Sequence, residues 1–426
     1  MRVFLQAIFG QLLLNAFIIW RGYRVFPPRS IGRRLFFLFF MIELLLYFLG
    51  YFFYKDLPDG IFLPIMMVCN TWYIASIYIA IGLLVLDLAR VTIRNFRKSG
   101  TNHESPLPQT PPKEENHSKV DLQFNFDYVD TPDVRQKQAV IAGCSLLRGN
   151  EANAISLHSP KRRIQFSIIV VFVAGLMIKG YHDAVYPVVR HLELHIPKSV
   201  EGRDSLTIVM MSDLHIGEAI GKKHVQRFVE LSNAEQPDLV VIAGDILDYE
   251  SRFAEKARIE EDLQRLNAPL GVYMTLGNHE YRANRFAKLR WIEKTGGILL
   301  VDSTVMPDST FYLIGRDDAT NLGRASLETL MQGVDSDKPV IVVDHQPIFA
   351  QDVINNQCDL GLFGHTHNGQ YWPFPLLFKL VYEFSYGYFL RENTHLYVSS
   401  GIGFAGPPYR IGTRSEMVVI QLRIEN

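Results

Sequence analysis

The sequence predicts an α/β domain that follows an all-α membrane region of about four helices. Long apolar stretches occupy much of the first 180 residues, whereas short β-branched or apolar runs alternate with helical segments from residue 190 onward. Charged residues make up only 20% of the 426-residue chain, below the roughly 25% of an ordinary soluble domain. Part of the chain is therefore expected to lie in lipid.

The net charge of −1 conceals two oppositely charged parts. Residues 187–426 carry 23 Lys and Arg against 31 Asp and Glu, while the preceding residues carry 20 against 13. This asymmetry is typical of a membrane-associated part joined to a soluble one. No global basic excess points to a nucleic-acid partner, and three cysteines are too few for a disulfide framework or a four-cysteine zinc site.

Three apolar stretches in the first ninety residues are each long enough to cross a membrane, which takes about 20 helical residues. They cover residues 3–20, 35–54 and 61–88. A shorter stretch at 164–178 is interpreted as a fourth span rather than a buried soluble helix, because Lys161, Arg162 and Arg163 precede it as a membrane-edge anchor would. The predicted division is a three-span region (1–99), a cytoplasmic and partly disordered linker (100–163), a fourth span (164–186) and the α/β domain (187–426).

The basic residues indicate which side of the membrane each connecting segment occupies. Five arginines lie between the first two stretches, and Arg90, Arg94, Arg97 and Lys98 follow the third. By the positive-inside rule, these two segments are cytoplasmic. The N-terminus and everything after residue 180 are then expected outside the cytoplasm.

Glu43 is an ionisable residue deep inside the second apolar stretch. Such a group is a candidate functional residue by default. The alternative is a structural pairing with Asn15 or Asn70 inside the helical bundle.

Five strand-like runs in the second part of the chain end in side chains that bind metals. The runs are LTIVMMSDLH, DLVVIAGDILD, GVYMTLGNHE, PVIVVDHQP and DLGLFGHTHNG. Ligands of open α/β sheets bind beyond the carboxyl ends of the strands, so these side chains are expected to meet at one place. They are Asp213, His215, Asp245, Asn278, His279, His345, His365 and His367.

The chemistry of these groups indicates two metal ions. Imidazoles with carboxylates and an amide, and without a thiolate, favour Mn²⁺, Fe or Zn²⁺. Eight groups are too many for one ion, whereas two ions about 3.5–4 Å apart would use them and would activate a shared water to attack phosphorus. Gly244, Gly277 and Gly364 each precede one of these side chains, as expected where the backbone turns sharply and approaches closely.

The five motifs together resemble the complete signature of the calcineurin-like metallophosphoesterases. They occur in the family's order, from Asp213-Leu214-His215 to Gly364-His365-Thr366-His367. The contexts SDLHIG, GNHEY, HQP and GHTHNGQ look most like a membrane-anchored bacterial branch often called YkuE-like. The resemblance covers roughly residues 190–424, and implies a two-sheet β-sandwich flanked by helices, anchored in a bacterial inner membrane. It does not extend to the first three spans or the linker.

The resemblance also implies a role for each site residue. The metal ligands would be Asp213, His215 and His367 for one ion, Asn278, His345 and His365 for the other, and Asp245 between them. His279 would act on the leaving group or the transition state and would not bind metal. Asp248, and less strongly Glu280, would orient the ligands. Arg410 is either a contact to the substrate phosphate or a surface or structural arginine.

The implied activity is hydrolysis of a phosphate ester by a hydroxide that two metal ions activate. Nine aromatic residues between Tyr371 and Phe389 follow His367. They form either an apolar rim that faces the bilayer or an acyl chain, or a core helix under the sheet. A rim would favour a phospholipid or lipid-linked phosphate as substrate.

Two other functions remain open at this stage. One is cleavage of the pyrophosphate of UDP-2,3-diacylglucosamine in lipid A synthesis, which the expected topology disfavours because such nucleotides are cytoplasmic. The other is a non-catalytic membrane module for binding or sensing, which the complete set of metal-binding side chains disfavours.

Overall fold

The computed structural model describes residues 2–23, 25–53, 56–100 and 160–424. Almost all of the linker predicted at 100–163 lies outside these described residues. The chain divides into two compact units. The first comprises Met1–Leu57 with Trp72–Val173, and the second Pro58–Thr71 with Ala174–Asn426.

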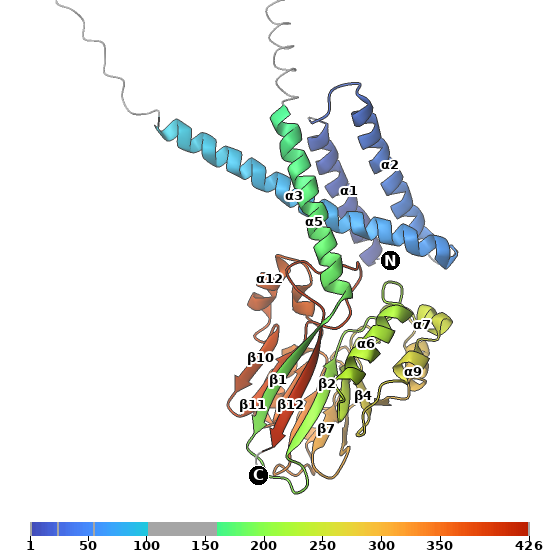
Figure 1. Cartoon of the computed structure of the whole chain (residues 1–426), viewed down its shortest axis with the longest axis vertical. Coiled ribbons are helices and arrows are strands. Elements are labelled where there is room, and N and C mark those ends of the chain that lie inside the picture. The colour runs from blue at the N-terminus through green and yellow to red at the C-terminus, as the bar shows by residue number, and fades with distance from the viewer. Residues whose placement is uncertain (1, 24, 54–55, 101–159, 425–426) are drawn as a thin grey trace, which may run out of the picture. The chain divides into compact units, whose positions relative to one another are not determined.

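Four helices form, over the described residues, where the sequence predicts an all-α region. They are α1 (Arg2–Gly22), α2 (Ile31–Phe52), α3 (Asp59–Gly100) and α5 (Pro160–Val185) (Figure 1). Two segments are long and apolar enough to cross a membrane, namely Asp59–Phe96 of α3 and Pro160–Val185 of α5. A shorter apolar segment, Ile8–Gly22, lies in α1.

A buried polar cluster links the helices of the first unit. The carboxylate of Glu43 accepts hydrogen bonds from Nδ2 of Asn15 at 2.6 Å and from Nε2 of Gln11 at 3.1 Å. Nε1 of Trp72 donates to Oδ1 of Asn15 at 3.0 Å, which ties α3 to the same cluster. Of the two amide partners that the sequence offers Glu43, the structure selects Asn15. Such interhelical hydrogen bonds stabilise a bundle that gains little from the hydrophobic effect in lipid.

Two six-stranded sheets form the centre of the second unit. The first has the order β1-β12-β2-β3-β4-β5 and the second β10-β11-β9-β8-β7-β6. The first-sheet strands are β1 (Val188–Ile196), β12 (Glu416–Ile424), β2 (Ser205–Met211), β3 (Leu239–Ala243), β4 (Val272–Thr275) and β5 (Ile298–Leu299). The second-sheet strands are β10 (Gly387–Arg391), β11 (Thr394–Val398), β9 (Leu360–Phe363), β8 (Val340–Val343), β7 (Tyr312–Gly315) and β6 (Ser303–Val305).

The central strands β3, β8 and β9 are continuously apolar because both of their faces are buried. Along β2, Ile208 and Met210 point between the two sheets, whereas Val209 and Met211 lie in the cluster under the helices. Helices α6 (Lys222–Ala234) and α9 (Arg285–Glu293) contribute to the cluster on the first sheet. Helix α11 (Ala350–Asn355) covers the outer face of the second sheet. The helix-flanked, two-sheet fold predicted from the resemblance is confirmed.

The loops that follow the parallel strands are joined to one another at the edge of the sheets. The backbone N–H groups of Asp213 and His215, after β2, donate to the carbonyls of Gly244 and Asp245, after β3, at 3.0 Å each. In the second sheet, the N–H of Gly364 donates to the carbonyl of His345 at 3.0 Å. The predicted metal-binding residues therefore lie on loops with fixed relative positions.

We expect the interior between the sheets to dominate the stability of the second unit. Leu362 in β9 is fully buried there, so Leu362→Ala should lower the free energy of unfolding by about 2–5 kcal/mol. The matched change Leu322→Ala, at a side chain 98% exposed, should alter it by less than about 0.5 kcal/mol. Thermal unfolding of the full chain in detergent measures both, and equal losses would contradict this assignment of the core.

Candidate metal centre

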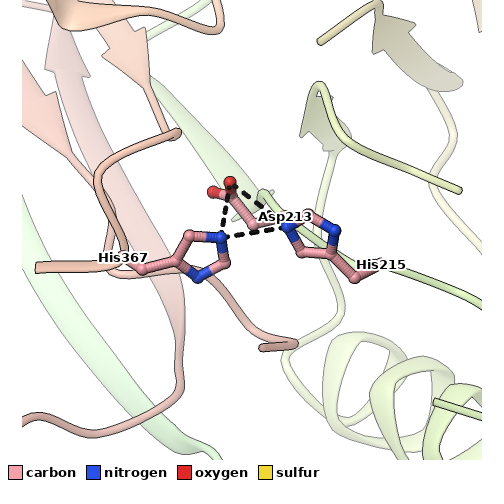
Figure 2. A group of neighbouring side chains, drawn as sticks. All are labelled: Asp213, His215 and His367. Atoms are coloured by element: carbon pink, nitrogen blue, oxygen red, sulfur yellow. Dashed lines mark hydrogen bonds and ion pairs between the residues drawn. The ribbon is translucent and has the colours of Figure 1, made fainter. Parts of the chain in front are cut away.

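Asp213, His215 and His367 form a first buried group whose ligand atoms all lie within 4.8 Å of one another. Nε2 of His215 lies 3.0 Å from Nε2 of His367, which in turn lies 3.3 Å from Oδ1 of Asp213. Figure 2 shows the two rings and the carboxylate directed toward a common point. Two of these residues follow β2 and the third follows β9, so the group joins the two sheets.

Asp245, His345 and His365 form a second group of the same kind. Nε2 of His345 lies 3.2 Å from Oδ2 of Asp245, and Nδ1 of His365 lies 2.9 Å from Oδ1 of Asn278. The same Oδ2 of Asp245 lies 3.7 Å from Nε2 of His215. Asp245 therefore stands between the two groups, where a bridging carboxylate is expected.

The histidine nitrogens of the two groups are arranged to bind metal ions. Nδ1 of His345 donates to the carbonyl of Ala243 at 2.9 Å, and this leaves a lone pair on its Nε2. That buried Nε2 has no hydrogen-bond partner among the described residues. The Nε2 atoms of His215 and His367 face each other at 3.0 Å, so both rings could turn a lone pair toward the same cation. A backbone carbonyl behind a ligating imidazole is the usual support of a metal site.

The electrostatic environment keeps two of the histidines in the neutral form that metals bind. Burial, and then the nearby His345, lower the pKa of His365 to about 4. Burial, His215 and Arg410 hold the pKa of His367 well below its usual range. His345 behaves differently: burial opposes its charged form, but the carboxylate of Asp245 outweighs this and raises the pKa of the imidazole. Bound cations would replace that proton as the partner of Asp245.

Five of the predicted ligands have left-handed backbone conformations, which residues other than glycine adopt only occasionally. Their φ angles are 54° for Asp213, 48° for His215, 50° for Asp245, 71° for His365 and 50° for His367. Each such conformation costs about 1–3 kcal/mol and persists only where the surrounding structure fixes it. The sequence motifs give no sign of this strain.

Two glycines are needed because ligand side chains approach their backbone. A Cβ on Gly277 would lie 2.2 Å from Oδ1 of Asp245, and one on Gly364 would lie 2.5 Å from Oδ2 of Asp213. Either contact is far inside van der Waals distance. The structure therefore confirms the predicted close approach of ligand side chains to the backbone at Gly277 and Gly364.

Asp248 lies against two histidines, His215 and His279, and forms with them a third group whose ligand-type atoms lie within 4.8 Å of one another. Its Oδ1 is 2.9 Å from Nδ1 of His279 and 3.5 Å from Nδ1 of His215. The pKa of Asp248 is lowered, because these two imidazoles outweigh the effect of burial. Asp248 is thus placed to orient His279 and one predicted ligand together. Nε2 of His279 is 2.6 Å from Nη1 of Arg282, a neighbour that the motifs do not reveal.

Two fully buried ionisable residues, Glu280 and Lys288, bind the backbone of the loops that follow β3 and β4. Glu280 accepts hydrogen bonds from the N–H groups of Asp245, Leu247 and Gly277 at 2.8–3.1 Å, and burial together with Asp245 raises its pKa to about 7. Nζ of Lys288 donates to the carbonyls of His279 and Asp248. Glu280 lies within a motif, whereas Lys288 lies on α9 outside all of them. The burial of Lys288, which is only 1% exposed, is what identifies it as a residue that supports the site.

Arg410 is a structural arginine in this site. It is fully buried, and its Nη atoms donate to the carbonyls of His367 at 3.1 Å and Gly403 at 2.8 Å. Nη2 also lies 3.2 Å from Nδ1 of His367, so it positions the ring. Burial lowers the pKa of its guanidinium to about 10. Of the two roles considered from the sequence, positioning of a ligand describes its contacts, and contact with a substrate phosphate does not.

The aromatic run after His367 includes helix α12 (Phe374–Val381), which has no buried residue. Leu380 and Val381 are 83% and 76% exposed. The alternative of a core helix under the sheet is therefore wrong for α12. Phe384, farther along the run, does belong to the interior of the second sheet.

Residues 206–369 match the family model of the calcineurin-like phosphoesterases. An uncharacterized metallophosphoesterase of Campylobacter jejuni is 31% identical over 264 residues, which are 61% of this chain and 69% of that protein. The chain therefore belongs to the calcineurin-like metallophosphoesterases. It is accordingly a metal-dependent hydrolase of phosphoric ester bonds.

Other relatives differ in how much of their length is matched. A zebrafish (Danio rerio) protein named transmembrane protein with metallophosphoesterase domain is 32% identical over 61% of this chain, but over only 63% of its own length. The metallophosphoesterase YkuE of Bacillus subtilis is 27% identical over 62% of this chain and 98% of that protein. The two apolar helices and the zebrafish name indicate membrane association. Among solved structures, a dimetal phosphatase from Danio rerio covers 50% of this chain and 98% of its own at 14% identity and a TM-score of 0.33.

We expect metal binding to depend on the side chains of the two groups. His345→Gln removes an imidazole whose Nε2 faces Asp245, and should lower the metal content of the purified full chain by about one equivalent. His395→Gln is the control, since His395 is a buried histidine of β11 that bonds Tyr388 and the carbonyl of His195. Metal analysis by mass spectrometry measures both. Equal metal content in the two variants would remove His345 from the site.

Proposed function

We propose that this protein is a membrane-anchored phosphoesterase that uses two divalent ions, Mn²⁺, Fe or Zn²⁺, to hydrolyse a phosphate ester of a lipid or lipid-linked molecule. The observation that carries the proposal is a pair of adjacent groups of metal-binding side chains, in which Asp245 of the second group lies 3.7 Å from His215 of the first. Asp213, His215 and His367 would hold one ion and Asn278, His345 and His365 the other. When bound, the two ions supply Lewis-acid activation of water and of the phosphoryl oxygens.

The chain's own residues would prepare the site and assist the reaction. His279 would assist the leaving group or stabilise the transition state, with Asp248 holding its ring through Nδ1 while Nε2 accepts a hydrogen bond from Nη1 of Arg282 at 2.6 Å. The N–H of His279 donates to Oδ1 of Asp245 at 2.8 Å, which fixes the spacing between this histidine and the carboxylate. Arg282 would add positive charge where the phosphate oxygens approach.

The lipid part of the proposal rests on the exposed apolar surface beside the site. Trp372, just before α12, is 49% exposed, and Phe374, Leu376 and Leu380 are 47%, 56% and 83% exposed. A contiguous apolar surface of this kind marks a site for lipid or another partner. Its helix begins seven residues after His367, so it would guide an acyl chain toward the metal groups.

The basic segments support an extracytoplasmic site in a bacterial inner membrane. The positive-inside rule assigns the arginine-rich segment between α1 and α2 and the basic end of α3 to the cytoplasm, and the second unit's α/β domain to the other side. A cytoplasmic UDP-linked substrate does not suit this orientation. A lipid phosphate carried on the outer leaflet does.

We predict that activity requires both the metals and Asp245. Removal of supporting partners around metal ligands already costs about 10- to 100-fold, so Asp245→Asn should lower kcat/KM for a phosphoester by more than about 100-fold. Metal chelation should inactivate the wild type, and added Mn²⁺ should restore it. Asp337→Asn, at an exposed carboxylate of the same type, is the matched control. An Asp245→Asn variant with ordinary activity would refute the two-metal mechanism.

A second prediction tests the acyl-chain surface. Replacing Leu376, Leu380 and Val381 by Ser should lower turnover of a lipid phosphate by about tenfold, because each exposed apolar side chain contributes roughly 1 kcal/mol or less of contact with the chain. Turnover of a small chromogenic ester should be spared. The ratio of kcat/KM for the two substrates measures the effect, and an unchanged ratio would rule out contact between α12 and the lipid.

A further inference from the structure

A cavity of about 480 Å³ lies in the second unit, and none of the predicted metal ligands lines it. Its lining comes from the end of α5, from residues 410–414 before β12, and from Arg190, Asn368 and Tyr386. Two of these segments are joined directly, since the N–H of Arg410 donates to the carbonyl of Gly180 in α5 at 2.9 Å. The cavity adjoins the metal centre, because Asn368 follows the predicted ligand His367 and Arg410 donates to the carbonyl of His367.

The cavity has a marked excess of positive charge. Lys179, Arg190, Arg410 and Arg414 line it, against a single carboxylate, Asp183. Asp183 pairs with Lys179, and Arg190 bonds the buried Glu416 through Nε at 2.5 Å. Arg414 has no acidic partner within 4 Å among the described residues and is exposed. An anion entering the cavity would therefore meet a guanidinium that is not already neutralised.

The end of α5 carries apolar and aromatic side chains as well as the cavity lining. Leu176 lines the cavity, and Ile178 in the same helix is 74% exposed. Tyr181 in the last turns of α5 and Tyr186 just after it are 37% and 54% exposed. Lysine and tyrosine at the end of a membrane-crossing helix are typical of the headgroup level of a bilayer.

The exposed apolar surface around α12 adjoins the same segment. The N–H of Trp372 donates to the carbonyl of Ile411 at 2.7 Å, and Ile411 lines the cavity. Trp372 precedes α12, whose Leu380 is 83% exposed. One edge of the second unit thus presents apolar side chains on both sides of a basic cavity. Neither a free phosphate nor a soluble nucleotide explains that combination, whereas an anionic phospholipid does.

We propose that this cavity binds the phosphate of an anionic phospholipid headgroup, as a site separate from the metal centre. Arg414 and Lys179 would contact the phosphate, while Leu176 and the α12 surface contact the upper acyl chains. The bound lipid would hold the second unit against the bilayer at a fixed depth. This inference depends on membrane association, but not on the identity of the hydrolysed substrate.

Lipid binding to the full chain in detergent tests the proposal. Fluorescent phosphatidylglycerol and phosphatidylcholine with identical acyl chains serve as probes, in an Asp245→Asn background so that turnover plays no part. We expect at least about tenfold tighter binding of phosphatidylglycerol, which corresponds to about 1.4 kcal/mol. Lys179→Gln with Arg414→Gln should remove this preference, and Arg414→Lys should retain most of it.

A matched control separates this cavity from general charge effects. Lys223→Gln with Arg227→Gln makes the same change of charge on α6, at residues that do not line the cavity. This variant should keep the preference for phosphatidylglycerol. Loss of the preference in the control, its persistence in the cavity variant, or inorganic phosphate binding as tightly as the lipid would each overturn the proposal. Failure of phosphoesterase activity would leave it intact.

Discussion

The structure depends on holding carboxylates and imidazoles of several strand ends within a few ångströms of one another, at a largely buried site. Asp213 and Asp245 are both almost completely buried, and isolated buried carboxylates would be strongly unfavourable. The protein compensates in part with histidines, which is why Asp245 has a pKa well below its ordinary value and His345 one well above. Divalent cations are the natural replacement for that shared proton.

The layer behind the site can be understood as support for this arrangement. Asp344, adjacent to His345, is buried between Arg316 and Arg324 at 3.1–3.2 Å. Buried ion pairs of this kind add little to stability, but breaking one leaves an unpaired buried charge. Glu280 and Lys288 act similarly through backbone groups on the other side. The ligand loops are therefore held by charges that cannot be removed singly without cost, and the left-handed conformations persist for the same reason.

Much of the site could be predicted from the sequence because its chemistry is carried by short motifs at strand ends. The placement of Asp213, Asp245 and His365 follows from the rule that ligands gather at the carboxyl ends of strands. The interactions that hold them could not be predicted in this way. Lys288 is an ordinary helical lysine in the sequence, and its role depends on where α9 packs against the loops. The role of Arg410 could not be decided from the sequence, because the motif PPYRIG does not show whether its arginine is buried or exposed.

The same distinction applies to the apolar parts of the chain. The apolar side chains of the α12 segment could pack either on the protein core or against lipid. The sequence alone does not distinguish these two environments, because both favour apolar side chains. Only tertiary structure shows that α12 packs on no core. Once it is known to be exposed, its sequence position between His367 and the basic cavity lining becomes informative. The exposed apolar helix and the positively charged cavity adjoin through the hydrogen bond between Trp372 and Ile411, so the two proposals made above concern one edge of the second unit.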